Sequence, residues 1–197
     1  MRTLIIIPVL LFSLFLGASS YSADFNKGLT AAQSGDFATA LKEWKPLAGQ
    51  GDADAQTNLG LMYQNGWGVP QDDKEAVYWY KLAAEQGDAK AQYNLGVMYD
   101  VGEGVPQDDK EAVRWYTLAA EQEHAKAQYN LGVMYALGEG VIKDYVYAHM
   151  WGNIASMNGN DKGETLRGYV AEKMTSSQIE EAQRLARECI KKNYKGC

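Results

Sequence analysis

The chain has 197 residues, of which 46% are hydrophobic and 22% are charged, and its formal net charge is −6 at pH 7. This length and composition are enough for one well-packed domain. An acidic balance gives the protein no electrostatic attraction to nucleic acid or to an anionic membrane surface, so neither is an expected partner.

Residues 1–23 have the pattern of a secretory signal peptide. Arg2 gives a positive start, residues 4–16 are almost uninterruptedly apolar, and small residues follow. The apolar run is too short to span a bilayer, which favours a cleaved leader over an uncleaved anchor. Three positions fit cleavage because each would leave a small residue as the last residue of the leader: Ser20, Ser22 and Ala23.

Removal of residues 1–23 leaves 18 basic and 25 acidic residues, since Arg2 is the only charged residue of the leader. No later apolar stretch is long enough to cross a membrane. The sequence therefore predicts an exported protein with no membrane insertion after cleavage.

A period of 36 residues runs through the middle of the chain. The segment AKAQYNLGVMY occupies 89–99 and again 125–135, and an altered copy, ADAQTNLGLMY, occupies 53–63. A fixed period of this size is the mark of a repeat architecture. We therefore divide the chain into an atypical N-terminal helix pair, three repeats and C-terminal capping helices: 24–52, 53–88, 89–124, 125–160 and 161–197.

Within a repeat the apolar spacing is helical. Ala91, Leu95 and Tyr99 fall on one stripe, and a Gly-x-Gly turn at 102–104 separates it from a second stripe. Asp108 is a predicted N-cap of the second helix, with Glu111 completing a capping box. Each repeat is thus predicted to be helix, glycine turn and helix, and stacked repeats share one core.

A glycine stands inside the first helix of every repeat, at 60, 96 and 132. Glycine in a helix costs about 1 kcal/mol relative to alanine. We expect this cost to be offset by the close approach of large side chains on the second helix. The candidates in the first two repeats are Trp79, Tyr80, Trp115 and Tyr116.

The motifs A-x-A-Q-x-N-L-G-x-M-Y, G-x-G-V-x-x-D and E-A-V-x-W-Y-x-x-A-A resemble the Sel1-like repeat, a relative of the tetratricopeptide repeat, over 53–160 and more loosely over 24–52. The resemblance implies an all-α fold, an α-α superhelix (solenoid) whose first helices line a concave face. It also implies an exported bacterial adaptor or regulator, periplasmic or secreted, that binds a protein or peptide, and we expect a monomer.

The register of the resemblance implies a set of partner-binding residues on the concave face. The alternative for Tyr93 and Tyr129 is that they pack between neighbouring helices. The nine positions are Asp54, Thr57 and Leu61, then Lys90, Tyr93 and Val97, then Lys126, Tyr129 and Val133.

Catalytic patterns are absent from the sequence: it has no S-x-x-K, G-x-S-x-G or phosphate-loop motif. His124 and His149 have no nearby partners for a triad or metal shell, so we predict no enzyme, no cofactor and no metal. Acidic residues around 100–109 suit helix capping better than a calcium site. A cysteine-rich branch of the family is associated with β-lactam binding or hydrolysis, which makes a binder or hydrolase of β-lactams or cell-wall fragments the alternative function. Residues 53–160 contain no cysteine.

Two further features stand outside the repeat pattern. Trp67 occupies a turn position held by Glu103 and Glu139 in the other repeats; it either folds back onto the first helix pair or anchors a partner. Cys189 and Cys197 are the only cysteines, and in an exported protein they favour a disulfide over two free thiols or a metal pair.

Overall fold

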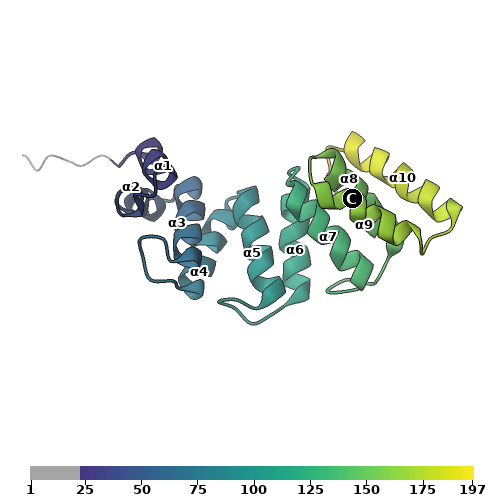
Figure 1. Cartoon of the computed structure of the whole chain (residues 1–197), viewed down its shortest axis with the longest axis horizontal. Helices are drawn as coiled ribbons and strands as arrows, with labels where there is room; N and C mark the ends of the chain where they lie inside the picture. Colours follow the sequence, from purple (N-terminus) through teal and green to yellow (C-terminus); the bar gives the residue numbers. More distant parts are fainter. Residues whose placement is uncertain (1–22) are drawn as a thin grey trace, which may run out of the picture.

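The computed structural model describes residues 23–197, in which α-helices follow one another and no strand occurs. The predicted signal peptide lies outside the described residues, except for Ala23. Figure 1 shows the helices in sequence order along one curved row, which confirms the all-α solenoid. No helix in this part of the chain is long and apolar enough to cross a membrane. The helices are α1 (Phe25–Gln33), α2 (Phe37–Gly49), α3 (Ala53–Asn65), α4 (Asp73–Glu85), α5 (Ala89–Val101), α6 (Asp109–Ala120), α7 (Ala125–Leu137), α8 (Tyr145–Met157), α9 (Asp161–Ala171) and α10 (Ser176–Lys191).

Each 36-residue repeat is a pair of packed helices: α3 with α4, α5 with α6, and α7 with α8. The second helices begin at an aspartate whose carboxylate accepts from backbone N–H groups, as Asp108 does from Lys110 and Glu111. Glu111 pairs with Arg114 at 3.1 Å instead of turning back to the cap. The reciprocal capping box is formed at the start of α10, between Thr175 and Gln178.

The two glycines of each Gly-x-Gly turn have different tasks. Gly102 ends α5 with a left-handed backbone (φ 75°), a conformation that favours glycine. Gly104 lies against the start of α4 in the preceding repeat, where a Cβ would overlap the carbonyl oxygen of Asp73. The same overlap would arise between Gly140 and Asp109 one repeat later. The turn therefore forms part of the joint between repeats.

The glycine inside each first helix permits a close helix contact. A Cβ built on Gly60 would lie 2.6 Å from the ring of Tyr80, and one on Gly96 would lie 2.7 Å from the ring of Tyr116. The tyrosines, rather than Trp79 or Trp115, make the approach in these two repeats. In the third repeat Gly132 faces the side chains of Leu166 and Trp151 and the backbone of Ala148.

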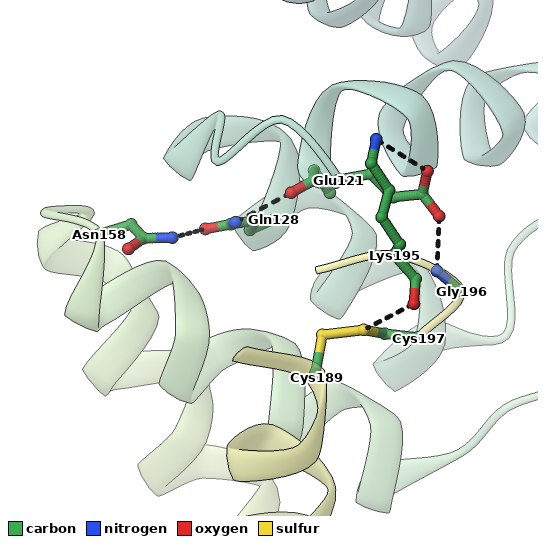
Figure 2. Close-up of a disulfide and its surroundings, with 8 residues drawn as sticks. Glu121, Gln128, Asn158, Cys189, Lys195, Gly196 and Cys197 are labelled. Atoms are coloured by element: carbon green, nitrogen blue, oxygen red, sulfur yellow. Dashed lines mark hydrogen bonds and ion pairs between the residues drawn. A yellow bond between two sulfur atoms is a disulfide. The ribbon is translucent and has the colours of Figure 1, made fainter. Parts of the chain in front are cut away.

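A buried glutamine connects three helices at every joint. Gln128 is fully buried, and its Nε2 donates to the carbonyl of Ala120 at the end of α6 (3.0 Å). Its Oε1 accepts from Asn158 at the end of α8 (2.9 Å), as Figure 2 shows. The same arrangement links Gln92 with Ala84 and Gln122, and Gln56 with Ala48 and Gln86.

The C-terminal end of the solenoid departs from the repeat pattern. The helix α9 follows α8 as a first helix would, but α10 packs back against α8. The predicted disulfide between Cys189 and Cys197 is present and joins the tail to the last turn of α10. The tail also reaches α6's end, because the Gly196 N–H donates to Glu121 (2.9 Å) and Lys195 lies 3.7 Å from the same carboxylate (Figure 2).

Candidate functional site

The sequence-predicted surface residues lie on the first helices α3, α5 and α7, and they differ in exposure. Three charged residues are exposed, five residues are partly buried, and one is buried. Only the first two groups can contact a partner directly. The groups are Asp54, Lys90 and Lys126; Leu61, Tyr93, Val97, Tyr129 and Val133; and Thr57.

Thr57 belongs to the joint between repeats. Its side chain is 3% exposed, and its hydroxyl donates to the carboxylate of Asp88, the N-cap of α5, at 3.0 Å. Tyr93 holds the same place in the second repeat and contacts the equivalent cap, His124, with ring centroids 4.6 Å apart. Tyr93 is larger than threonine and stays partly exposed. This register position therefore contributes to stacking in both repeats and to the surface in the second.

The structure brings Tyr93, Lys126 and Tyr129 together in one cavity of about 540 Å³, which we call the α7–α9 pocket. Its volume falls in the range of about 300–1,000 Å³ that is typical of ligand-binding pockets. One wall comes from α5 and α7, and the other comes from the start of α9. The polar and aromatic residues that line it are Tyr93, Lys126, Tyr129, Asn130, Asn160, Asp161 and Lys162.

The contribution of α9 to this pocket was missed at the sequence level. Lys162 follows Lys126 by 36 residues, the same step that separates Lys126 from Lys90. Each of the three lysines is exposed on the first turn of its helix. Asn160 caps α9 through its bond to the Lys162 N–H, as His124 caps α7 through Ala127. The period therefore continues one helix beyond the third repeat, and it was a usable signal.

Two side chains at the pocket have shifted pKa values. Burial, and then the positive charge of Lys126, holds the pKa of His124 below its ordinary value, so its imidazole is neutral at pH 7. Its Nδ1 accepts from the Ala127 N–H, which requires that nitrogen to be unprotonated. Burial, and then the charge of Asp100, raises the pKa of Tyr93, so its hydroxyl stays protonated. The pocket thus offers hydrogen-bond donors and aromatic surface.

Trp67 lines a second, more apolar cavity of about 260 Å³ near the N-terminal end. Its ring stacks on Phe37 of α2, with centroids 5.2 Å apart and an angle of 10° between the planes. The side chain is still 42% exposed. Leu61 lies in the same cavity. Trp67 thus folds back onto the first helix pair through its stack on α2, and the exposed part of its ring leaves surface for a partner.

The two histidines lie on different repeats: His124 caps α7, and His149 lies within α8. His149 is buried on α8, and its Nδ1 has no hydrogen-bond partner among residues 23–197. Burial, and then Arg167, lowers its pKa. Within the same residues, no group of three His, Cys, Asp or Glu side chains is placed to hold a metal ion. Asp108 caps α6 in the acidic stretch around 100–109.

Comparisons with known proteins agree with the repeat architecture. The segments 53–88, 89–124 and 125–160 each match the family model described as Sel1 repeat. A comparison with curated proteins gave no match.

Two solved structures are similar over most of this chain. One is c5321, a protective antigen present in uropathogenic Escherichia coli strains that displays an SLR fold (TM-score 0.74, 31% identity, covering 85% of this chain and 41% of that one). The other is a Sel1 repeat protein from Oxalobacter formigenes (TM-score 0.70, 31% identity, covering 84% of this chain and 75% of that one). The chain thus spans about two fifths of the first protein and three quarters of the second.

Proposed function

Because the chain belongs to the Sel1 repeat family, we propose that it is a non-catalytic adaptor that holds a protein or peptide partner against the first helices of its repeats. Proteins of this family are generally protein-interaction modules without catalytic activity. The observation that carries the proposal is the α7–α9 pocket, where aromatic and charged side chains from successive repeats converge. Tyrosine is enriched at protein interfaces because it combines a large contact area with a polar end.

The adaptor is proposed to work outside the cytoplasm, in the periplasm or after secretion. The disulfide between Cys189 and Cys197 supports an oxidising compartment, where such bonds persist. The expected leader at 1–23 points the same way. We propose that the adaptor works as a monomer, without cofactor or metal, and does not bind nucleic acid.

The remaining surface of the first helices extends the proposed contact along the solenoid. Lys90 and Asp54 are exposed, while Leu61, Val97 and Val133 are partly buried and contribute apolar edges. Trp67 is proposed as a secondary anchor at the N-terminal end.

Site-specific photo-cross-linking tests the location of this surface. A photoreactive phenylalanine is placed at Tyr129 in the pocket, at Val97 on α5, or at Tyr78, which is 54% exposed on the second helix α4. We expect a discrete adduct in cells from the first two positions and none from Tyr78.

The partner identified in the adduct is then purified by itself, and its binding to the chain without the photoreactive residue is measured by titration. Binding should weaken at least tenfold for Tyr129→Ala, while circular dichroism shows unchanged helix content. Equal cross-linking from Tyr78, or binding that is indifferent to Tyr129, would contradict the proposal. Turnover of nitrocefin by the purified protein would favour the β-lactam alternative instead.

A further inference from the structure

The α7–α9 pocket carries an excess of positive charge in an acidic protein. Lys126 and Lys162 line it, against one carboxylate, Asp161. Neither lysine forms an ion pair within residues 23–197. The two ammonium groups occupy equivalent first-turn positions on α7 and α9, which are in contact. They therefore face the same pocket, and no carboxylate within residues 23–197 is paired to either one.

The helix caps around the pocket have also lost the negative charge that the earlier repeats place there. Asp52 and Asp88 cap α3 and α5, whereas the caps of α7 and α9 are His124 and Asn160. His124 is neutral at pH 7 because burial and Lys126 disfavour its charged form. At α7 the electropositive helix end therefore adds to the charge of Lys126, whereas the first turn of α9 carries Asp161 and Glu164 beside Lys162.

The wall beside the lysines is aromatic. Tyr93 contacts the rings of His124 and Tyr116, at 4.6 and 6.1 Å between centroids, so its orientation is fixed by packing. Tyr129 lies one repeat further along and packs at the edge of a cluster that contains Ala148 and Leu166. A ligand that fits this surface carries an anionic group next to an apolar side chain.

We propose that the partner segment bound in the α7–α9 pocket is an extended peptide that presents an aspartate or glutamate side chain to Lys126 and Lys162. This inference rests on the proposed function and specifies its ligand. The cavity of about 540 Å³ is lined by Tyr93 of α5, and Lys90 is exposed one helical turn before Tyr93, so an extended peptide that passes through the cavity can also contact α5. An internal acidic side chain therefore suits it better than a chain end.

The test is a selection from a phage-displayed random dodecapeptide library in which both peptide ends are joined to the coat protein. The baits are the wild-type chain, Lys126→Gln/Lys162→Gln, and the control Lys74→Gln/Lys110→Gln. Lys74 and Lys110 are also 36 residues apart and exposed, on the first turns of α4 and α6, so both variants change the net charge equally. We expect the wild type and the control to enrich peptides that contain aspartate or glutamate. The pocket variant, Lys126→Gln/Lys162→Gln, should not enrich them.

Affinities of individual synthetic peptides make the test quantitative. An exposed lysine–carboxylate contact contributes up to about fivefold in affinity, so loss of both lysines should weaken binding by up to about 25-fold. A peptide whose aspartate or glutamate is changed to asparagine or glutamine should bind weakly, and it should bind equally to the wild type and to Lys126→Gln/Lys162→Gln. Asp161→Asn should tighten binding several-fold. Because Lys126 and Lys162 are exposed, the melting temperature of the pocket variant should match that of the wild type.

The outcomes separate this inference from the proposed function. Peptides that depend on Tyr93 and Tyr129 but show no acidic preference would overturn the inference and leave the adaptor function standing. A library that yields no tyrosine-dependent peptide would overturn both. Synthetic peptides whose binding requires a free carboxyl terminus, or lysine-dependent binding of phosphatidylglycerol vesicles without peptide binding, would reassign the pocket and overturn the proposal.

Discussion

Replacing Gly96 by alanine places one methyl group where α5 and α6 approach most closely. The added Cβ would lie 2.7 and 2.8 Å from two ring carbons of Tyr116, whereas ordinary contacts begin at 3.4 Å. The ring would have to move by about 0.7 Å or deform its surroundings. Tyr116 is fully buried, and its hydroxyl donates to Asp100 at 3.0 Å, so such a movement disturbs the core and a hydrogen bond.

Two effects of opposite sign decide the net change in stability. Overpacking of this kind costs about 1–3 kcal/mol. Alanine recovers about 1 kcal/mol because it is a better helix former than glycine. We therefore expect Gly96→Ala to lower the free energy of unfolding by about 1 kcal/mol, or the melting temperature by about 2–4 °C for a domain of this size. Gly96→Leu should cost more, since leucine adds three further carbons.

Gly168 supplies a matched control. It lies 36 residues after Gly132, inside α9, and apart from its chain neighbours and the nearby backbone of its own helix no heavy atom lies within 4 Å of the position of its Cβ. Only helix propensity changes there, so Gly168→Ala should stabilise the protein by about 0.5–1 kcal/mol. The two variants undergo the same chemical change with opposite results.

The assay is urea and thermal unfolding of both variants, followed by circular dichroism at 222 nm. A second background, Tyr116→Leu, removes the ring; there Gly96→Ala should lose most of its penalty. The close-approach explanation is refuted if Gly96→Ala raises the melting temperature as much as Gly168→Ala does.

Three other perturbations test the joints and the tail. Gln128→Leu should lower the free energy of unfolding by about 1–3 kcal/mol, because it removes two hydrogen bonds of a fully buried side chain, one to the Ala120 carbonyl and one from Asn158; urea denaturation measures this, and an unchanged midpoint would contradict the role of the glutamine. His124→Asp keeps an N-cap that stays ionised between pH 5 and 7. Folding lowers the pKa of His124, so the wild type has the full stabilisation from this cap above the ordinary histidine pKa of about 6.5 and loses it as the pH falls through the pKa of the folded state. The difference in melting temperature between His124→Asp and the wild type should therefore widen from pH 7 to pH 5. A constant difference would refute this. Reduction of the Cys189–Cys197 disulfide should destabilise the protein by about 2–3 kcal/mol from loop closure and speed amide exchange in residues 193–197; equal exchange in both states would show that the hydrogen bonds to Glu121 hold the tail alone.

Much of the fold can be predicted from the sequence, because the 36-residue period is strict and the residues that begin and end the helices have clear conformational preferences. Asp108 and Gly102 mark a start and an end whose backbone requirements few other residues satisfy. Gln128 is harder to interpret, since a glutamine on a helix usually faces water. Its role depends on two neighbouring helices, which end 8 residues earlier and 30 residues later in the chain.

The identity of the close aromatic follows from helix geometry that the sequence pattern left open. Tyr116 shares a face with Ala112 and Ala119, which are both fully buried, so its ring points at the facing helix. Trp115 is one residue, or about 100°, further round the helix and packs elsewhere in the core.

The surface residues could be predicted only in part. The register placed Tyr93, Lys126 and Tyr129 on one side, and the structure brings these three into one pocket. It could not show that the cap of the next helix covers Thr57, because that contact depends on the spacing between adjacent repeats. The role of Lys162 was concealed by the end of the recognisable motif at residue 160, although the 36-residue step continues.

Joints that share their main contacts make the length of this protein adjustable in whole repeats. Gly104 meets Asp73 as Gly140 meets Asp109, and the buried glutamines repeat the same bonds across each boundary. A second copy of residues 89–124, inserted after the first, would therefore find a matching surface on both sides. It would move the Trp67 cavity and the α7–α9 pocket apart by one repeat without altering the residues of either. The spacing between two attachment points on a partner is thus a separate variable from the affinity of each one.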